Sequence, residues 1–293
     1  MLSADGVKMI NIVVVGDVIG AGASTVAVGI AQLAADNELS VNLRRFGSDD
    51  RSLIDAQNFS ELLLDGIDTG TGAPSSALEL ADSTGNICVI EVSSKDEAEL
   101  LNSFPDSKII YVQGSESNGR ADASLTIRNR NFVDENFSLG EDRLLAAPTV
   151  RDLINATDSA VLTRSVTGER EICEHVVIGA ISHDPADDYF GRFGRKAVVV
   201  RAEKVDLGLA ALLSGAQCLI LTGGHEPSPY LLDRAAASRD TTVILSPSPT
   251  ATTAKNLEGT FGMSPFSHSD KARRIKELIA QKVDATKQKE LFF

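Results

Sequence analysis

Cysteine is scarce in this sequence, and the few cysteines present form no motif. Cys88, Cys173 and Cys218 stand far apart and make no Cys-x-x-Cys pair. Cys88 and Cys218 lie inside apolar runs. This pattern indicates buried thiols in a reducing compartment.

Basic residues and long hydrophobic runs are also lacking. The chain carries 28 Lys and Arg against 41 Asp and Glu, a net charge of −13, which argues against nucleic acid or an anionic membrane as its main partner. No apolar run reaches the roughly 18 residues that a membrane helix needs. No basic region followed by an apolar core opens the chain, so we expect no secretory signal and a cytoplasmic protein.

What the sequence does contain is an alternation of apolar strands and helical patterns over 293 residues. That length suffices for one large domain or two of ordinary size. Strands that alternate with helices predict α/β layers around a mostly parallel sheet. Because a polar stretch at 129–142 is the best candidate boundary, we expect a first domain at 1–146 and a second α/β domain at 147–293.

Apolar periodicity assigns the elements of each half. In the first half we expect strands at 10–15, 40–43, 87–90, 108–112 and 123–127, and helices at 24–36, 53–64, 74–82 and 95–104. In the second half we expect strands at 176–181, 197–200, 218–221 and 242–245, and helices at 150–155, 206–214, 227–238, 250–258 and 269–283.

A glycine-rich loop, Gly16–Thr25, joins the first strand to the first helix. A strand, loop and helix start of this kind places backbone N–H groups around a phosphate. Gly16, Gly22 and Ser24 match the two glycines and the magnesium-binding hydroxyl of a phosphate-binding loop, but the gap between the glycines is one residue too long. Ala23 stands where the lysine that reaches the β- and γ-phosphates belongs.

Several interpretations of this loop remain open. It is a degenerate loop with weak or no nucleotide binding, a real anion or nucleotide site, a dinucleotide site, or only a tight turn. For a dinucleotide site the third glycine is missing, and Arg44-Arg45 at the end of the second strand would suit NADP rather than NAD. The candidate nucleotide- or phosphate-binding residues are Gly16, Gly20, Gly22, Ser24, Thr25 and Arg45.

Glu91 ends a buried strand that faces the same edge as the loop. Together with Ser24 it is a candidate ligand for Mg²⁺, since magnesium is bound by carboxylate and hydroxyl oxygens next to phosphates. A polar residue that only marks the end of a strand explains Glu91 equally well.

A second glycine pair, Gly223-Gly224, follows a buried strand and precedes a helix. With Thr222 it predicts a second anion nest, although a close backbone approach explains the glycines equally well. The segment 183–188 gathers one histidine and three aspartates, for which turn and helix-cap roles are favoured over metal binding. No nucleophile–histidine–acid arrangement is evident, so we assign no catalytic residue.

The second half resembles the DRTGG domain. The resemblance rests on 147–153, on the strand that ends at Gly179-Ala180, and on the helix at 209–212 that leads to 221–224. Glu203-Lys204 occupy the positions of the Asp-Arg pair of that family, with both charges kept. The resemblance implies a second anion site formed by Glu203, Lys204, Asp206, Thr222, Gly223 and Gly224.

The first half resembles the dethiobiotin-synthetase-like P-loop domain. In this order the two halves resemble the N-terminal region of long bacterial phosphotransacetylases and the stand-alone proteins related to it. The acetyltransferase domain of those enzymes would need roughly 300 further residues, which this sequence does not hold. The resemblance therefore implies a regulatory or ligand-sensing module with no acetyl transfer of its own.

We expect a non-catalytic or weakly nucleotide-binding protein that senses a phosphate-bearing ligand or contacts a partner enzyme of acetyl- or acyl-phosphate metabolism, and that forms a homo-oligomer. One alternative is an ATP-dependent enzyme of the dethiobiotin-synthetase type. In it the loop, Ser24, Thr25 and Glu91 would hold Mg-ATP, and an arginine would replace the missing lysine. A further alternative is an NADP-binding protein.

Overall fold

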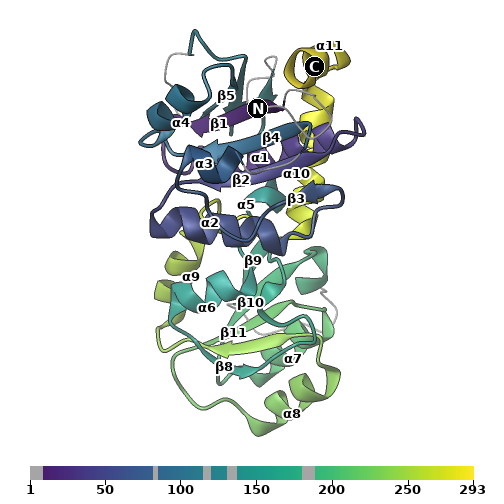
Figure 1. Cartoon of the computed structure of the whole chain (residues 1–293). Helices are drawn as coiled ribbons and strands as arrows, with labels where there is room; N and C mark the ends of the chain where they lie inside the picture. The colour runs from purple at the N-terminus through teal and green to yellow at the C-terminus, as the bar shows by residue number, and fades with distance from the viewer. Residues whose placement is uncertain (1–8, 82–84, 115–119, 131–136, 180–188) are drawn as a thin grey trace. The chain divides into compact units, whose positions relative to one another are not determined.

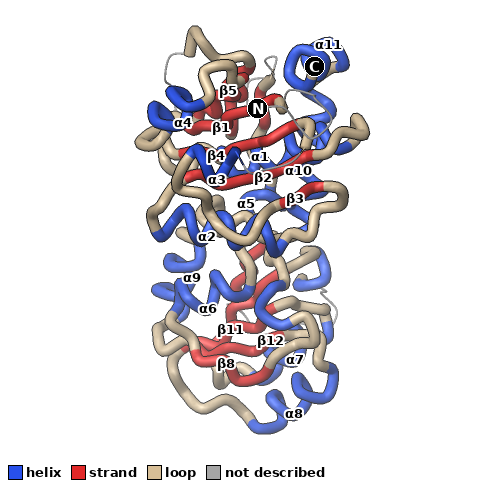
Figure 2. Tube along the Cα trace, viewed as in Figure 1, coloured by secondary structure: helices blue, strands red, loops and turns tan. Residues whose placement is uncertain are grey.

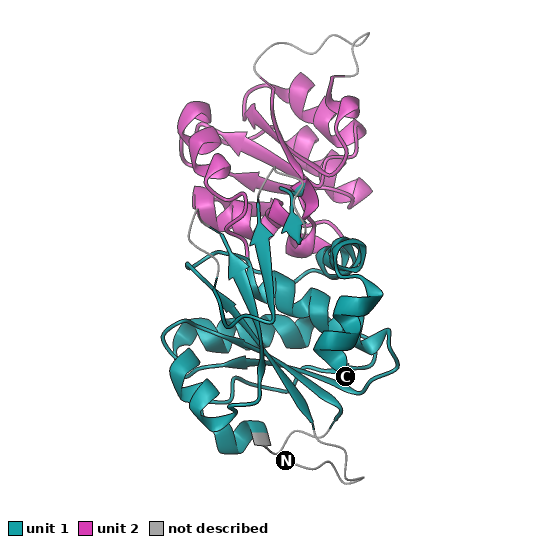
Figure 3. Cartoon of the chain, turned by 90° about the horizontal axis from the view of Figure 1, so that it is seen from above, with its two compact units in different colours: residues 1–142, 265–293 teal, residues 143–264 magenta. Residues whose placement is uncertain are grey.

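The chain folds into two units, each built on its own β-sheet (Figure 1). The structure is a computed structural model that describes residues 9–81, 85–114, 120–130, 137–179 and 189–293. The first unit is Met1–Asp142 together with Pro265–Phe293, and the second is Arg143–Ser264 (Figure 3). The second unit is thus inserted into the sequence of the first.

A seven-stranded parallel sheet forms the centre of the first unit, in the order β3-β2-β4-β1-β5-β6-β7. Its strands are β1 (Ile10–Gly16), β2 (Val41–Phe46), β3 (Ile67–Asp68), β4 (Ile87–Val92), β5 (Lys108–Gln113), β6 (Leu125–Asn129) and β7 (Ser138–Leu139). The central strands are rich in Val and Ile and almost wholly buried, as is typical of parallel sheets covered on both faces. Val14 of β1 pairs with Glu91 of β4, so both strands end at the same edge.

The helices of the first unit come from both ends of the chain (Figure 2). They are α1 (Ala23–Ala35), α2 (Asp50–Glu61), α3 (Ala77–Ala81), α4 (Glu97–Ser103), α10 (Ser269–Lys282) and α11 (Ala285–Phe292). α10 packs on α1, where a Cβ added at Gly29 would lie 2.8 Å from Ile279 Cγ1 and 3.0 Å from Ile275 Cγ1. Glycine thus permits a close approach of the two helices.

The second unit has a five-stranded sheet in the order β8-β12-β11-β10-β9. Its strands are β8 (Ala160–Thr163), β9 (His175–Ile178), β10 (Lys196–Arg201), β11 (Cys218–Thr222) and β12 (Thr242–Leu245), and only β8 runs antiparallel to its neighbour. Its helices are α5 (Arg143–Ala146), α6 (Val150–Thr157), α7 (Val205–Leu213), α8 (Pro229–Ser238) and α9 (Thr250–Glu258), with short 3₁₀ turns at Gly168–Arg170 and Phe190–Arg192. α6 begins with a capping box between Thr149 and Asp152.

The expected α/β class and the mostly parallel sheet of the first half are confirmed. Three short strands, β3, β7 and β8, and two helices, α5 and α11, were not expected from the sequence. The two-residue strands β3 and β7 are too short to show a period, and β8 lies in a run that is rich in turn-forming residues.

The expected second domain of 147–293 differs from the units of the structure. Residues 265–293, which carry α10 and α11, belong to the first unit. The reason is the packing of α10 on α1, which no local pattern reveals because the two helices are far apart in sequence.

The three cysteines are buried and free, as expected for thiols inside apolar runs. Burial raises the pKa of the Cys88 thiol to about 12. No helix in the described part of the chain is long and apolar enough to cross a bilayer.

Candidate functional site

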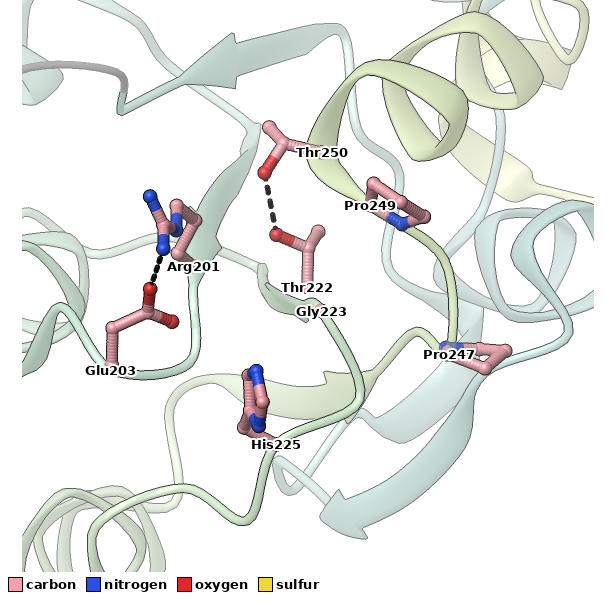
Figure 4. A pocket seen from close by; sticks show the side chains of 8 residues that line it. All are labelled: Arg201, Glu203, Thr222, Gly223, His225, Pro247, Pro249 and Thr250. Carbon is pink, nitrogen blue, oxygen red and sulfur yellow. Dashed lines mark hydrogen bonds and ion pairs between the residues drawn. The ribbon is translucent and has the colours of Figure 1, made fainter.

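A pocket opens in the second unit where β10 and β11 end and α9 begins. β10 and β11 are parallel and in register from Ala197–Cys218 to Arg201–Thr222, so Arg201 and Thr222 lie side by side at the carboxyl edge. This edge of an open parallel sheet is where ligands of α/β proteins commonly bind. The pocket has a volume of about 370 Å³ and is lined by Arg201, Glu203, Thr222, Gly223, His225, Pro247, Pro249 and Thr250 (Figure 4). We call it the Arg201 pocket.

Hydroxyl groups hold the strand ends of this pocket to the start of α9. Thr222, which is fully buried, donates from Oγ1 to the carbonyl of Val200 at 3.2 Å, and its Oγ1 lies 2.8 Å from Oγ1 of Thr250 (Figure 4). A neighbouring pair, Ser246 and Thr253, is joined at 3.0 Å. The position of α9 is therefore tied to the ends of β11 and β12.

The charged side chains of the pocket, Arg201 and Glu203, are exposed to solvent. Arg201 and Glu203 form an ion pair, with 65% and 42% of their side chains exposed. A hydrogen bond from its own backbone N–H and the nearby charge of Arg201 hold the pKa of Glu203 below its usual value. His225 lies on the other side of the same space (Figure 4). An incoming anion would therefore compete with Glu203 for the guanidinium group.

The N-terminus of α9 adds a partial positive charge to the pocket. Pro249 is the N-cap of α9 and provides no side-chain acceptor for the N–H groups of the first turn. The first backbone bond of the helix runs from Thr253 N to Pro249 O. The unpaired N–H groups at the start of a helix favour an anion.

Only part of the predicted second anion site lines this pocket. Glu203, Thr222 and Gly223 do, whereas the lining does not include Lys204, Asp206 and Gly224. The backbone N–H groups of Gly223 and Gly224 donate to Ser248 O at 3.0 Å and to Ser246 O at 3.2 Å. Both groups are therefore hydrogen-bonded to the loop after β12 and are not directed at an anion. Sequence reasoning missed Arg201, His225, Pro247, Pro249 and Thr250. The available signal was Arg201 at the end of a buried strand, two residues before Glu203.

In the first unit, the loop from Gly16 to Gly22 is a closed turn. Ala21 N donates to Val18 O at 3.1 Å, and Asn129 Nδ2 donates to Ala21 O at 2.7 Å. Gly22 is the N-cap of α1 with φ 97°, and a Cβ there would lie 2.2 Å from Asn129 Nδ2. Glycine at this position is required by both the backbone conformation and the close approach of Asn129.

Ser24 and Glu91 are in contact beneath this loop. Ser24 Oγ, in the first turn of α1, donates to Glu91 Oε1 at 2.8 Å. Glu91 is 6% exposed, and burial raises the pKa of its carboxyl group to about 7, against the lowering effect of Arg45. Glu91 Oε2 and Arg45 Nε are buried and have no hydrogen-bond partner among the residues the structure describes. The sequence thus placed Ser24 and Glu91 correctly at one edge.

Arg45 faces protein groups rather than the loop. Its guanidinium donates to the carbonyls of Phe46 at 2.7 Å and Glu91 at 3.3 Å, and its Nε lies 3.6 Å from Asp55 Oδ2 and 3.9 Å from Glu91 Oε1. Arg44 is likewise bound to Asp68, with 2.6 Å between Nη2 and Oδ2. Both arginines already have acidic partners, so no observation here favours an NADP phosphate. Thr25 and Gly20 lie on α1 and in the loop, outside this charged cluster.

The described residues contain no group of three or more His, Cys, Asp or Glu side chains placed to hold a metal ion. The histidine and aspartates of 183–188 lie outside the residues that the structure describes.

Comparison with known protein families shows that part of the second unit is similar to one of them. Residues 152–260 match the DRTGG domain. The Arg201 pocket lies within the matched range, and the match ends between α9 and the return of the chain to the first unit. The relation of the first unit to the P-loop domain of phosphotransacetylases stays a prediction.

Part of the chain is similar to a solved structure. It is the crystal structure of the CBS and DRTGG domains of the regulatory region of Clostridium perfringens pyrophosphatase, complexed with its activator, diadenosine tetraphosphate. The identity is 17% and the TM-score 0.34, over 43% of this chain and 53% of that one. This chain therefore spans about half of the structure that it matches.

Proposed function

We propose that this protein is a regulatory, ligand-sensing protein whose DRTGG domain binds a phosphate-bearing ligand in the Arg201 pocket. The observation that carries the proposal is the combination of Arg201, His225 and the N-terminus of α9 around one space of about 370 Å³. A guanidinium group and helix N–H groups are the groups that bind phosphate oxygens. The two prolines of the lining supply an apolar wall for the rest of the ligand.

Regulation is favoured over catalysis because the pocket lacks an activated nucleophile. Its hydroxyls, on Thr222 and Thr250, are bonded to each other and to a backbone carbonyl. Neither contacts a base that would accept its proton, which nucleophilic catalysis requires. The pocket therefore supports binding, and the response would be passed to the rest of the chain or to a partner enzyme of acetyl- or acyl-phosphate metabolism.

Titration calorimetry tests the proposal with ATP, ADP, acetyl phosphate and coenzyme A as probes. At least one probe should bind with saturation, and Arg201→Ala should weaken that binding about tenfold or more, since a hydrogen bond to a charged group contributes roughly 1.5 to 3 kcal/mol. Arg164→Ala is the matched control, because Arg164 is a similarly exposed arginine of the same unit, paired with Glu169. Absence of heat with every probe, or equal losses in both variants, would reject the proposal.

A second candidate function is supported by the first unit. Glu91 Oε2 is buried and unpartnered next to Ser24, which is the arrangement expected where a divalent cation belongs. Ser24 and Glu91 would hold Mg²⁺, which would neutralise phosphate charge in an ATP-dependent enzyme of the dethiobiotin-synthetase type. ATP turnover that disappears in Ser24→Ala supports this function. No turnover with small carboxylic or amine substrates rejects it.

A further inference from the structure

A groove of about 820 Å³ lies in the first unit, and neither proposed function uses it. It is lined by the end of α1 with the connection to β2, by the connection from α2 to β3, and by the first turns of α10. All these segments belong to the first unit. Two of them lead into the amino ends of β2 and β3, whereas the Gly16–Gly22 loop follows β1, and the strands are parallel. The groove therefore lies at the edge of the sheet opposite to the loop, and we call it the Leu63 groove.

Leu63 has a backbone conformation that leucine rarely adopts. It directly follows Leu62, the C-cap of α2, and has φ 49°. Glycine or asparagine usually occupies this left-handed position after a helix, because a larger side chain is disfavoured there. Since 86% of Leu63 is exposed, its side chain gains little from packing that could offset the strain. A leucine that is kept here against the local preference points to a use beyond the stability of the fold.

Leucines form the apolar part of the groove. Leu39 and Leu64 line it together with Leu63 and are half-buried. Small-molecule sites are concave and bury most of the surface of their ligand. A side chain as exposed as Leu63 is covered only by a larger partner, and apolar side chains laid into a groove are a recurring mode of peptide recognition. The apolar part of the groove therefore favours a segment of a protein over a small molecule.

The charged side chains that line the groove leave an excess of negative charge. Its two basic residues, Arg273 and Lys276, each form an ion pair with an aspartate. Glu38, which also has a left-handed φ of 59°, and Asp65 are exposed, and neither has an ion-pair partner among the residues that the structure describes. The last turn of α1 contains no basic residue, so the partial negative charge of this helix end adds to theirs. The groove is therefore complementary to a partner that carries cations.

We propose that the Leu63 groove binds a segment of a partner protein in which apolar side chains are flanked by Lys or Arg. The apolar side chains of the segment cover Leu63, and its cations pair with Glu38 and Asp65. Charge argues for this partner and against a second copy of the chain, because a net charge of −13 makes two copies repel each other. The proposal does not depend on a ligand of the Arg201 pocket, which belongs to the other unit.

Fluorescence anisotropy with the full chain tests the proposal with a synthetic peptide as the probe. The probe repeats Lys-Leu-Leu-Lys and carries fluorescein. It should bind about tenfold or more tightly than a Lys-Ala-Ala-Lys peptide, which lacks the large apolar side chains, and than a Glu-Leu-Leu-Glu peptide, which has the opposite charge. Added salt should weaken its binding. Absence of binding by the probe, or equal binding by the alanine peptide, overturns the proposal.

Leu63→Asn locates the binding of the probe. Asparagine tolerates the left-handed conformation, so the variant should keep the urea midpoint of the natural chain. It should weaken the probe about tenfold, because it removes the apolar side chain that the partner covers. Leu78→Asn is the matched control, since Leu78 is 76% exposed on α3 of the same unit and does not line the groove. Equal losses in the two variants overturn the proposal.

A charge variant tests the acidic part of the groove. Glu38→Gln should weaken the probe about threefold at low salt and less at high salt, as is typical of an exposed pair. Glu99→Gln is the control, because Glu99 is an exposed residue of α4 outside the lining, and it should change affinity less. Equal effects of the two variants would show that the probe responds only to the net charge, which contradicts a specific groove.

Sedimentation equilibrium decides whether a second copy occupies the groove instead. The natural chain and Leu63→Asn should show the same association state, since the proposed occupant is another protein. If the natural chain is a dimer that Leu63→Asn dissociates, the groove is an interface between copies and the proposal is overturned. Neither result bears on the Arg201 pocket, so the proposed function is tested separately by its own calorimetry.

Discussion

Arg274 Nε and Asp142 Oδ2 lie 2.8 Å apart, although 132 positions separate the two residues in the sequence. Asp142 is the last residue of the first unit before the chain enters the second unit, and Arg274 lies on α10, the first helix after its return. The bond therefore joins the two segments of the first unit that the second unit separates in the sequence.

Arg274→Ala should lower the free energy of unfolding of the first unit by about 1 kcal/mol or less. The effect is small because 37% of the Arg274 side chain is exposed, and solvent screens such pairs. Urea denaturation at low and high salt measures it, and the loss should shrink as salt rises. Arg273→Ala is the control, since the ion pair of Arg273 is with Asp270 on the same helix. An equal loss for Arg273→Ala would contradict the special role of the bond to Asp142.

Gly29→Ala should destabilise the first unit by about 1 kcal/mol or more, despite the better helix propensity of alanine. The added methyl group would meet Cγ1 of Ile275 and Ile279, atoms close to the backbone that cannot turn aside. At Gly208 of α7 the added group would meet mainly the end methyls of Leu231, which can rotate, so Gly208→Ala should cost little. The urea midpoints of the two variants measure the difference in stability. An unchanged midpoint for Gly29→Ala would contradict the close packing of α10 on α1.

The sequence predicts the layers of this fold better than its connections. Alternating strands and helices fix the α/β class, and the alanine-rich pattern of α1 indicates a closely packed helix. No local pattern tells that the partner of Gly29 is α10, some 240 residues later, because packing partners are chosen by the whole fold. The helix at 269–283 was therefore found but assigned to the wrong unit.

The candidate sites also differ in how far the sequence predicts them. Ser24 and Glu91 were expected at one edge because both follow from strand ends of a parallel sheet, and they are 2.8 Å apart. Arg201 and Thr250 were missed because their meeting depends on the order of β10, β11 and β12 and on the path of the loop before α9. Strand order is a property of the tertiary structure that spacing along the chain does not contain.

Glu203→Gln should tighten the binding of an anionic probe to the Arg201 pocket about threefold. The substitution removes the carboxylate that pairs with Arg201 and competes with the ligand, and the gain is small because solvent screens an exposed pair of this kind. Calorimetry with the probe that binds the natural chain measures the change. Glu226→Gln removes the same charge from an exposed residue that does not line the pocket, and should change affinity less. Equal gains in both variants would indicate a general charge effect.

The stability of the first unit should fall as the pH rises from about 4.5 to about 7, through Glu91. Burial raises the pKa of this carboxyl group from 4.5 to about 7 in the folded chain, so in this window the folded state keeps a proton that the unfolded state has released. The unfolded state binds fewer protons, the slope of unfolding free energy against pH is negative, and it returns to zero above the folded pKa.

Glu91→Gln isolates this contribution, since glutamine does not titrate but keeps an oxygen that accepts from Ser24. The difference in unfolding free energy between the natural chain and Glu91→Gln should move in favour of the variant by up to about 3 kcal/mol between pH 4.5 and pH 8, at 1.36 kcal/mol per pKa unit. Urea denaturation across this range measures the difference. Ser24→Ala removes a hydrogen bond that lowers the pKa of Glu91, so it should extend the pH-dependent window upward. Parallel pH profiles for the natural chain and Glu91→Gln would mean that Glu91 is ionised at low cost, which its buried, unpartnered Oε2 argues against.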